Sequence, residues 1–151
     1  MDTAYKTTLE LDKVLARAVQ LCACQETKEM MQALEPAPTV EDERYDLAQT
    51  NAINALLIKN GSPRFGSVHE VRRIVAHARK GGILSMGELL EIAATLRNFS
   101  GLSQWYGLSE HEMLPTDDLF FSLAPQPVLE KQISESILSP EEMADTASVT
   151  L

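Results

Sequence analysis

The three histidines of the chain are the first candidates for chemistry, because imidazole can act as a metal ligand or a general base. His69 and His77 are eight residues apart, about two helical turns, whereas a helical metal site places its ligands one turn apart. Glu70 shares a face with His77 but stands roughly 10 Å from it along the helix axis. Each histidine, His111 included, is therefore predicted to be a surface residue, and no Ser–His–Asp or Cys–His set has local support.

Neither the cysteines nor the glycine pair indicates a cofactor site. Cys22 and Cys24 lie two residues apart in a helical pattern, so at roughly 100° per residue their side chains point in nearly opposite directions. They are predicted to be reduced thiols of a cytosolic protein. The chain lacks a G-x-x-x-x-G-K-S/T motif, and Gly81-Gly82 is predicted to end a helix. The sequence thus predicts no catalytic residue, no cofactor-binding residue and no metal site in this chain.

One basic cluster stands out, and it consists of Arg64, Arg72, Arg73, Arg79 and Lys80. Arg72 and Arg79 are seven residues apart on one predicted helix, and Arg73 and Lys80 repeat that spacing one step around it. The two rows of positive charge lie away from the apolar stripe of the same helix. These five residues form the candidate contact site of the chain.

The net charge of −9 is unevenly distributed, and this limits what the basic cluster can bind. Residues 1–60 carry six basic and ten acidic side chains, a sum of −4. Residues 61–100 carry six basic and three acidic side chains (+3), and residues 101–151 carry one basic and nine acidic side chains (−8). An acidic chain repels phosphate backbones, so nucleic acid could approach only through the middle segment. Three interpretations stay open: a solvated or salt-bridged helix face, contact with nucleic-acid phosphates, and docking on an acidic neighbouring domain.

The composition is that of a folded, water-soluble domain. The chain has 151 residues, of which 44% are hydrophobic and 23% charged, enough for one domain with a hydrophobic core. Aromatic residues make up only 5%, which favours helices over strands. The N-terminus resembles no signal peptide, and no stretch reaches the roughly 18 apolar residues of a membrane span. We expect a cytoplasmic protein without membrane contact.

Apolar spacing and capping signals predict a series of helices. The predicted inner faces of three of them consist of Leu11, Val14, Leu15, Ala18 and Cys22, of Ala48, Ala52, Ala55 and Leu56, and of Val71, Ile74, Val75 and Ala78. Thr39 is predicted to cap a long helix that stops at Gly61, and Ser67 and Ser85 are predicted to open two further helices through capping boxes. The predicted helices span residues 11–22, 27–34, 40–60, 68–80 and 86–105, with shorter ones over 119–123 and 128–137. Residues 139–142 are either a helix start or a turn. No strand pattern alternates with them, so the predicted fold class is all-α, an irregular multi-helix bundle.

Several short motifs resemble the MutS-two family, the bacterial MutS homologues with a C-terminal Smr nuclease domain. They are Thr-Leu-Glu-Leu-Asp-Lys at residues 8–13, the loop at 61–66, Lys-Gly-Gly-Ile-Leu-Ser at 80–85, and the segments at 88–90 and 95–97. Residues 145–151 resemble the family's D-x-A-S-x-x-L segment. The chain departs from the family at Arg64, where a small residue or proline is usual. It also lacks the glycine of the turn near Glu141.

The resemblance implies that this chain is the first part of the helical MutS core, the base of the clamp and lever. Residues 1–138 would form the core domain, and residues 139–151 a turn or tail leading into the lever helix. The other MutS domains would be its partners in cis and would supply the ATPase, with ATP and magnesium, and the endonuclease. The whole protein would be a homodimer that acts on DNA, in recombination control or mismatch-repair-like processes, or on ribosomes in their rescue.

Two other kinds of protein remain possible from the sequence. A free-standing helical adaptor would bind a protein partner through an exposed apolar strip. An enzyme with an unrecognised site is the third reading, although no set of side chains supports it. The non-catalytic core domain of a MutS-type protein is the interpretation that accounts for most of the chain.

Overall fold

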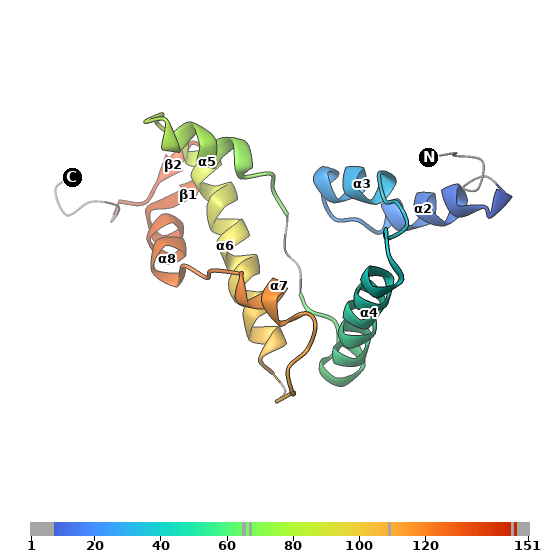
Figure 1. Cartoon of the computed structure of the whole chain (residues 1–151). Helices are drawn as coiled ribbons and strands as arrows, with labels where there is room; N and C mark the ends of the chain where they lie inside the picture. Colours follow the sequence, from blue (N-terminus) through green and yellow to red (C-terminus); the bar gives the residue numbers. More distant parts are fainter. Residues whose placement is uncertain (1–7, 65, 67, 109, 146, 148–151) are drawn as a thin grey trace. The chain divides into compact units, whose positions relative to one another are not determined.

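The computed structural model describes residues 8–145 and 147, with the exception of residues 65, 67 and 109 (Figure 1). The described part contains the helices α2 to α8 and one two-stranded hairpin, which confirms the predicted all-α class. The chain divides into two compact units, Met1–Pro38 and Thr39–Leu151. The domain boundary predicted between residues 138 and 139 stays a prediction. The boundary between the two compact units lies between residues 38 and 39 of the chain.

The first unit contains α2 (Leu11–Gln20) and α3 (Gln25–Gln32), which pack against each other. The half-buried side chains Leu11, Leu15 and Ala18 recur at the spacing of one helix face, as the amphipathic pattern predicts. Val14, predicted in the same stripe, is 60% exposed. No residue of α2 or α3 is buried, so these two helices do not enclose a core of their own.

The second unit starts with α4 (Val40–Asn60), whose two ends lie where the sequence predicts them. Thr39 Oγ1 accepts a hydrogen bond from the amide of Asp42 at 3.1 Å, which satisfies one of the free amides of the first turn. Gly61 follows the last turn with a φ of 73°, in the left-handed region that favours glycine. Both ends of α4 therefore carry the local signals that the sequence predicts.

The next two helices test the two predicted capping boxes. The box over residues 85–88 is confirmed: α6 (Met86–Tyr106) starts with Ser85 Oγ accepting from the Glu88 amide, and the Glu88 carboxylate accepts from the Ser85 amide. The helix predicted to open through the box over residues 67–70 begins later than predicted. Helix α5 (Arg72–Arg79) begins two residues after Glu70, and its N-cap, Val71, makes no side-chain cap hydrogen bond. Ser67 lies outside the described residues.

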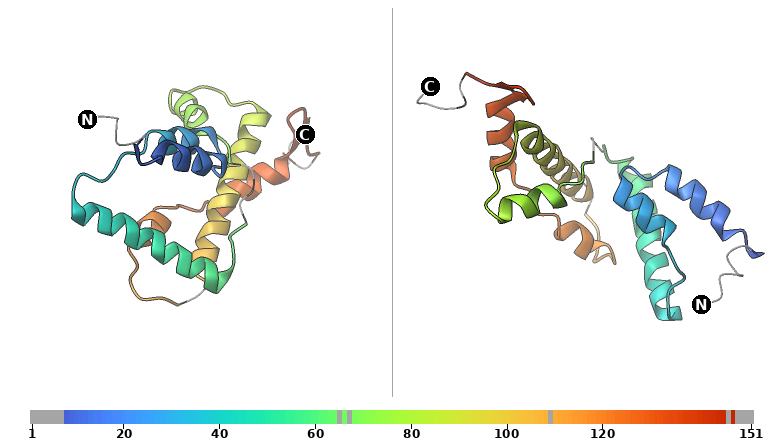
Figure 2. Two further views of the ribbon diagram at one scale, coloured as in Figure 1. Left: turned by 90° about the vertical axis from the view of Figure 1, so that its right-hand side faces the viewer. Right: turned by 90° about the horizontal axis from the view of Figure 1, so that it is seen from above.

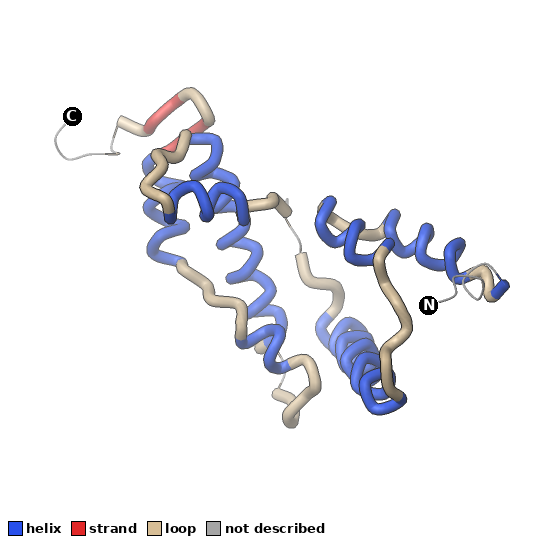
Figure 3. Tube along the Cα trace, turned by 45° about the horizontal axis from the view of Figure 1, so that its top comes forward, coloured by secondary structure: helices blue, strands red, loops and turns tan. Residues whose placement is uncertain are grey.

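The C-terminal part adds α7 (Asp117–Phe121), α8 (Pro127–Ser136) and the strands β1 (Ile137–Ser139) and β2 (Glu142–Met143), which pair antiparallel (Figure 3). The strands were not expected from the sequence. Residues 139–142 form the turn alternative, with Pro140 and Glu141 at its tip and no glycine. The Ser139 hydroxyl accepts a hydrogen bond from the Glu141 amide at 3.3 Å, so a side chain supports this turn.

Helix α6 connects two separate hydrophobic clusters. Its first half packs on α8 and β1 (Figure 2). The buried residues Ala93, Ile133 and Ile137 form the cluster there. Its last turn joins α4 and α7 around a second cluster, Leu56, Trp105 and Tyr106, with Phe120 packed against it. In α4 only Leu56 is buried, and the predicted inner residues Ala48 and Ala55 are exposed, so this part of the predicted face is wrong.

No helix among the described residues is long and apolar enough to cross a membrane.

Candidate functional site

The structure places four of the five predicted contact residues on one short helix. Arg72, Arg73 and Arg79 belong to α5, and Lys80 is its C-cap. Arg64 lies on the connection between α4 and α5. All five side chains belong to exposed residues. Four of the five residues thus lie on α5 or at its end, whereas Arg64 is part of a loop. Val75 and Ala78, which the predicted apolar stripe of this helix included, are exposed, so this part of the stripe is wrong.

Helix α5 presents opposite sides to the protein and to solvent. Ile74 is 8% exposed and anchors the helix. At about 100° per residue, Arg72 and Arg79 point away from Ile74, on the opposite side of the helix. A shallow hollow on this outer side is lined by Arg72, Val75, Ala76, Arg79 and Lys80. We call these five residues the α5 face.

The C-terminal end of α5 is fixed by its backbone. The amides of Gly81 and Gly82 donate to the carbonyls of Ala78 and His77, and Gly81 has a φ of 82°. A Cβ atom on Gly82 would lie 2.2 Å from His77 Nε2, so the His77 ring occupies the space beside this glycine. The pair Gly81-Gly82 ends the helix, as predicted, and holds the position of Lys80.

The charges at the start of α5 oppose the helix dipole. Arg72 and Arg73 occupy the first turn, where the partial positive charge of the dipole disfavours cations, and this turn contains no acidic residue. We therefore expect Arg73→Glu to raise the free energy of unfolding by about 0.3–1 kcal/mol, as measured by urea denaturation. Arg73→Gln should give a smaller gain in the same direction. A loss of stability in both variants would show that Arg73 makes a stabilising contact instead.

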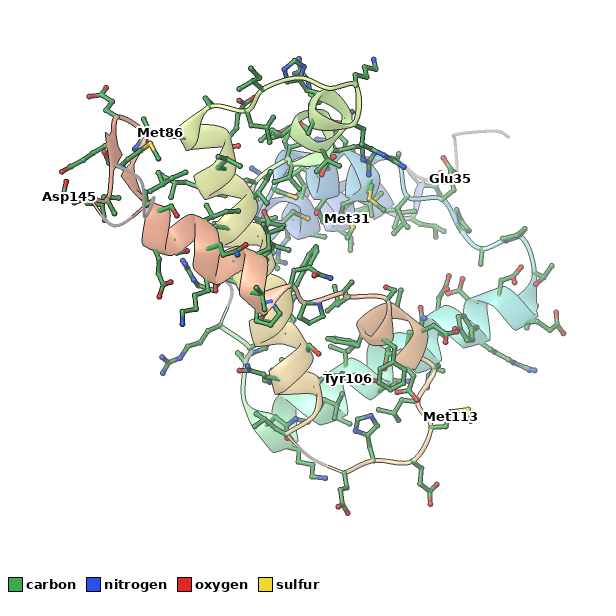
Figure 4. The ribbon with its side chains drawn as sticks, turned by 90° about the vertical axis from the view of Figure 1, so that its left-hand side faces the viewer. Met31, Glu35, Met86, Tyr106, Met113 and Asp145 are labelled. Carbon is green, nitrogen blue, oxygen red and sulfur yellow. The ribbon has the colours of Figure 1, made fainter. Side chains whose placement is uncertain are left out.

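A second polar cluster, which the sequence did not suggest, lies where α6 meets α7. Tyr106, labelled in Figure 4, is 3% exposed. Its hydroxyl donates to Asp117 Oδ1 at 2.6 Å and lies 2.8 Å from Thr116 Oγ1. The Asp117 carboxylate also accepts from the Leu114 amide at 3.1 Å. Thr116 is fully buried. These hydrogen bonds link the end of α6 to the start of α7 and to the connection between them.

His111 belongs to this cluster, so the prediction of a surface histidine is wrong here. Its side chain is only 19% exposed, its Nε2 lies 3.5 Å from Asp117 Oδ1, and its ring meets Tyr106 edge-on at 4.8 Å. Tyr106 also stacks on Phe120 with ring centroids 3.9 Å apart. Tyr106 and His111 are five residues apart, a spacing that matches no motif in the sequence. A loop rather than a helix brings the two rings together, so their contact was not predictable from the spacing.

Contacts within the cluster change the pKa values of Tyr106 and Asp117. Burial raises the pKa of the Tyr106 hydroxyl to about 12, and the hydrogen bond to Asp117 acts in the same direction. The hydrogen bond from Tyr106 lowers the pKa of the Asp117 carboxyl, helped by the Leu114 amide and His111 and opposed by burial. At neutral pH a protonated phenol therefore donates to a carboxylate. This arrangement stabilises a loop and offers no activated nucleophile.

Replacing Asp117 with asparagine should change how stability depends on pH. Because folding lowers the pKa of Asp117, its ionic stabilisation is complete above the ordinary value of 3.8 and is lost as pH falls through the lower folded value. In urea denaturation, Asp117→Asn should be less stable than the wild type at neutral pH, and the two should converge in acid. Glu112→Gln, at an exposed residue of the same connection, is the control. An equal difference at every pH would contradict the ionic contribution.

The cysteines have ordinary local partners. Cys22 donates to the Ala18 carbonyl at 3.4 Å, Cys24 Sγ lies 3.0 Å from Thr27 Oγ1, and both thiols are free. Within residues 8–145 and 147, apart from the three undescribed positions, no three His, Cys, Asp or Glu side chains are grouped to hold a metal ion. We take the α5 face, with its exposed cations and its hollow, as the candidate functional site.

Comparison with known proteins finds relatives of one name. The chain is 31% identical over 153 residues to "Endonuclease MutS2" of Ruminiclostridium cellulolyticum, an alignment that covers 100% of the chain and 19% of that protein. "Endonuclease MutS2" of Clostridium beijerinckii is 29% identical over 145 residues, covering 95% of the chain and 18% of the relative. The protein of the same name from Lachnospira eligens is 28% identical over 151 residues, covering 100% and 19%.

Nearly the whole chain is thus similar to part of several proteins named Endonuclease MutS2. It spans about a fifth of the length of the curated MutS2 relatives it matches. No family model and no solved structure matches it. The resemblance inferred from the short motifs is thereby confirmed, although the segment at residues 145–151 falls mostly outside the described residues.

Proposed function

We propose that the chain is a non-catalytic helical core segment of a MutS2-type protein. The observation that carries this proposal is the similarity of 95–100% of the chain to only 18–19% of proteins named Endonuclease MutS2. The predicted catalytic machinery of such a protein then belongs to its other domains. In this proposal the chain contributes shape and stiffness.

The distribution of apolar side chains supports a segment that packs against further protein. Large apolar residues are exposed on α2, α3 and α4 and after α2, among them Val14, Leu21, Met30, Leu47 and Ile58 at 60%, 88%, 73%, 53% and 79%. Leaving such side chains in water forgoes roughly 1.5–3 kcal/mol each of burial free energy. Exposed apolar surface on this scale is typical of a surface that another element covers.

The long helices suit the transmission of movement. Helices α4 and α6 have 21 residues each, and α6 joins both hydrophobic clusters of the second unit. A helix held at both ends moves as a rigid body, so a displacement at one cluster reaches the other. In the whole protein, this segment would carry ATP-driven movements between the ATPase and the clamp.

The name of the relatives, Endonuclease MutS2, supports an endonuclease activity for the whole protein, and the other activities proposed for it are those that the resemblance to the MutS-two family implies. Such a protein would be a cytoplasmic, homodimeric, DNA-binding ATPase and endonuclease that uses ATP and magnesium. It would act on branched DNA in recombination control, or on ribosomes in their rescue. The other MutS2 domains would be the partners of this chain in cis.

Activity measurements on the chain test its non-catalytic role. Incubated with ATP and magnesium, the chain should release no phosphate above a buffer blank, and it should leave branched DNA uncut. A whole MutS2-type relative is the positive control in both assays. Turnover by the chain that survives further purification would contradict the proposal and favour the reading of an unrecognised enzyme.

The exposed apolar side chains would equally serve a free-standing helical adaptor. The gene separates these two functions. A reading frame that continues past Leu151 into a long heptad tract and a Walker motif is expected for the MutS2 segment. A stop codon directly after Leu151 would favour the adaptor.

A further inference from the structure

We propose that the α5 face docks an acidic amphipathic helix of a protein partner. The face is built from cations and small apolar groups on one side of a helix, with Ile74 holding the other side in place. This docking role does not depend on the scaffold role proposed above, since an adaptor could use the same surface.

The floor of the α5 face is apolar, and this points to a protein partner. Val75 and Ala76 lie one turn from both Arg72 and Arg79, and both are exposed, Val75 at 43%. Burying these groups is favourable only against apolar atoms of the partner. A phosphate backbone would pair with the cations but would cover Val75 and Ala76 with charged oxygens, which costs free energy.

The spacing of the cations matches the repeat of a helix. Arg72 and Arg79 are seven residues apart, so their Cα atoms are separated by roughly 10.5 Å along the axis. Two carboxylates seven residues apart on a partner helix have the same separation, with apolar residues at the third and fourth positions between them facing Val75 and Ala76. The small side chain of Ala76 permits close approach of the two helix axes.

Charge supports the same partner. The α5 face contains three cationic side chains, Arg72, Arg79 and Lys80, and no acidic one, whereas the whole chain carries −9. Repulsion from the rest of the chain acts more strongly on a nucleic acid, with one charge per roughly 1.7 Å of duplex, than on a helix with a few carboxylates. The guanidinium groups of Arg72 and Arg79 can each bind a carboxylate through two hydrogen bonds.

A peptide titration against the full chain tests the docking face. The probe is a fluorescent helical peptide of about 20 residues with glutamates seven apart and leucine and alanine between them. Its partner control replaces the glutamates with glutamine. The chain variants are Arg79→Glu with Lys80→Glu, which alters the face, and Arg17→Glu with Arg44→Glu, which makes the same change in net charge on α2 and α4 at exposed residues. Circular dichroism checks that each variant keeps its helix content.

The glutamate peptide should bind the wild type and the Arg17/Arg44 variant equally, and the Arg79/Lys80 variant should bind at least about tenfold more weakly. Val75→Ser should weaken binding of the glutamate peptide by about threefold, because the substitution removes apolar contact without changing the charge. Equal affinity for both charge variants, or for the glutamine peptide, would overturn the proposal. The titration is repeated with a DNA duplex of about 20 base pairs and with an RNA of similar length. If either binds more tightly than the peptide, and this binding is lost in the Arg79/Lys80 variant, the α5 face binds phosphates instead.

Discussion

Replacing Trp105 with alanine should lower the free energy of unfolding by about 3–5 kcal/mol, the largest change expected for any single residue of the chain. The side chain is 6% exposed in the cluster that joins α4, α6 and α7, and its ring lies 6.0 Å from that of Phe120. Truncation leaves a cavity beside Leu56. The loss also removes the hydrogen bond from Nε1 to the Gly61 carbonyl, 2.8 Å long, which ties the end of α4 to α6.

Urea denaturation followed by far-ultraviolet circular dichroism measures this effect, because the variant has no tryptophan left for fluorescence. Trp105→Phe separates the two contributions: it keeps an aromatic ring but loses the indole N–H, and should cost about 1–3 kcal/mol. If Trp105→Phe were as unstable as Trp105→Ala, the hydrogen bond to Gly61 would outweigh packing. A loss below about 1 kcal/mol for Trp105→Ala would mean that this cluster is not a core.

Replacing Ile133 with alanine should cost about 2–5 kcal/mol. Ile133 is 7% exposed and packs with Ala93 and Ile137 where α8 and β1 meet the first half of α6. Its removal leaves a cavity that Ala93, at 2% exposure and with a single methyl group, cannot fill. We therefore expect α8 and the hairpin to be destabilised together.

A graded series makes this expectation specific. Ile133→Val removes one methyl group and should cost about 0.5–1.5 kcal/mol in thermal or urea unfolding. Val128→Ala, at a residue of the same helix that is 70% exposed, should change stability by no more than about 0.5 kcal/mol. A similar loss at Val128 and Ile133 would contradict the burial of one face of α8.

Helix ends were predictable wherever a local side chain or glycine defines them. Thr39 and Ser85 cap their helices through hydrogen bonds within three residues, so no other part of the chain is needed. The box at residues 67–70 has the same residue types, yet α5 starts after it. A serine and a glutamate at the right spacing are thus not sufficient to place the start of a helix.

The basic face of α5 was predictable for the same reason: the positions of side chains around a helix follow from its period. The cluster around Tyr106 was not. His111 and Asp117 reach Tyr106 through a loop, and the stacking of Tyr106 on Phe120 joins two different helices. Such contacts depend on how the connection folds back, which local spacing does not encode.

The sequence alone determined the all-α class, the bounds of α4 and α6 and the basic side of α5, because each rests on residues within a few turns of one another. Matching segments along the chain carry its similarity to proteins named Endonuclease MutS2. Only the tertiary structure decided which apolar residues are buried, that Ala48 and Ala55 are exposed, and that residues 137–143 pair as strands. Burial depends on contacts between distant segments, and a short strand pair gains its stability from the helix it covers.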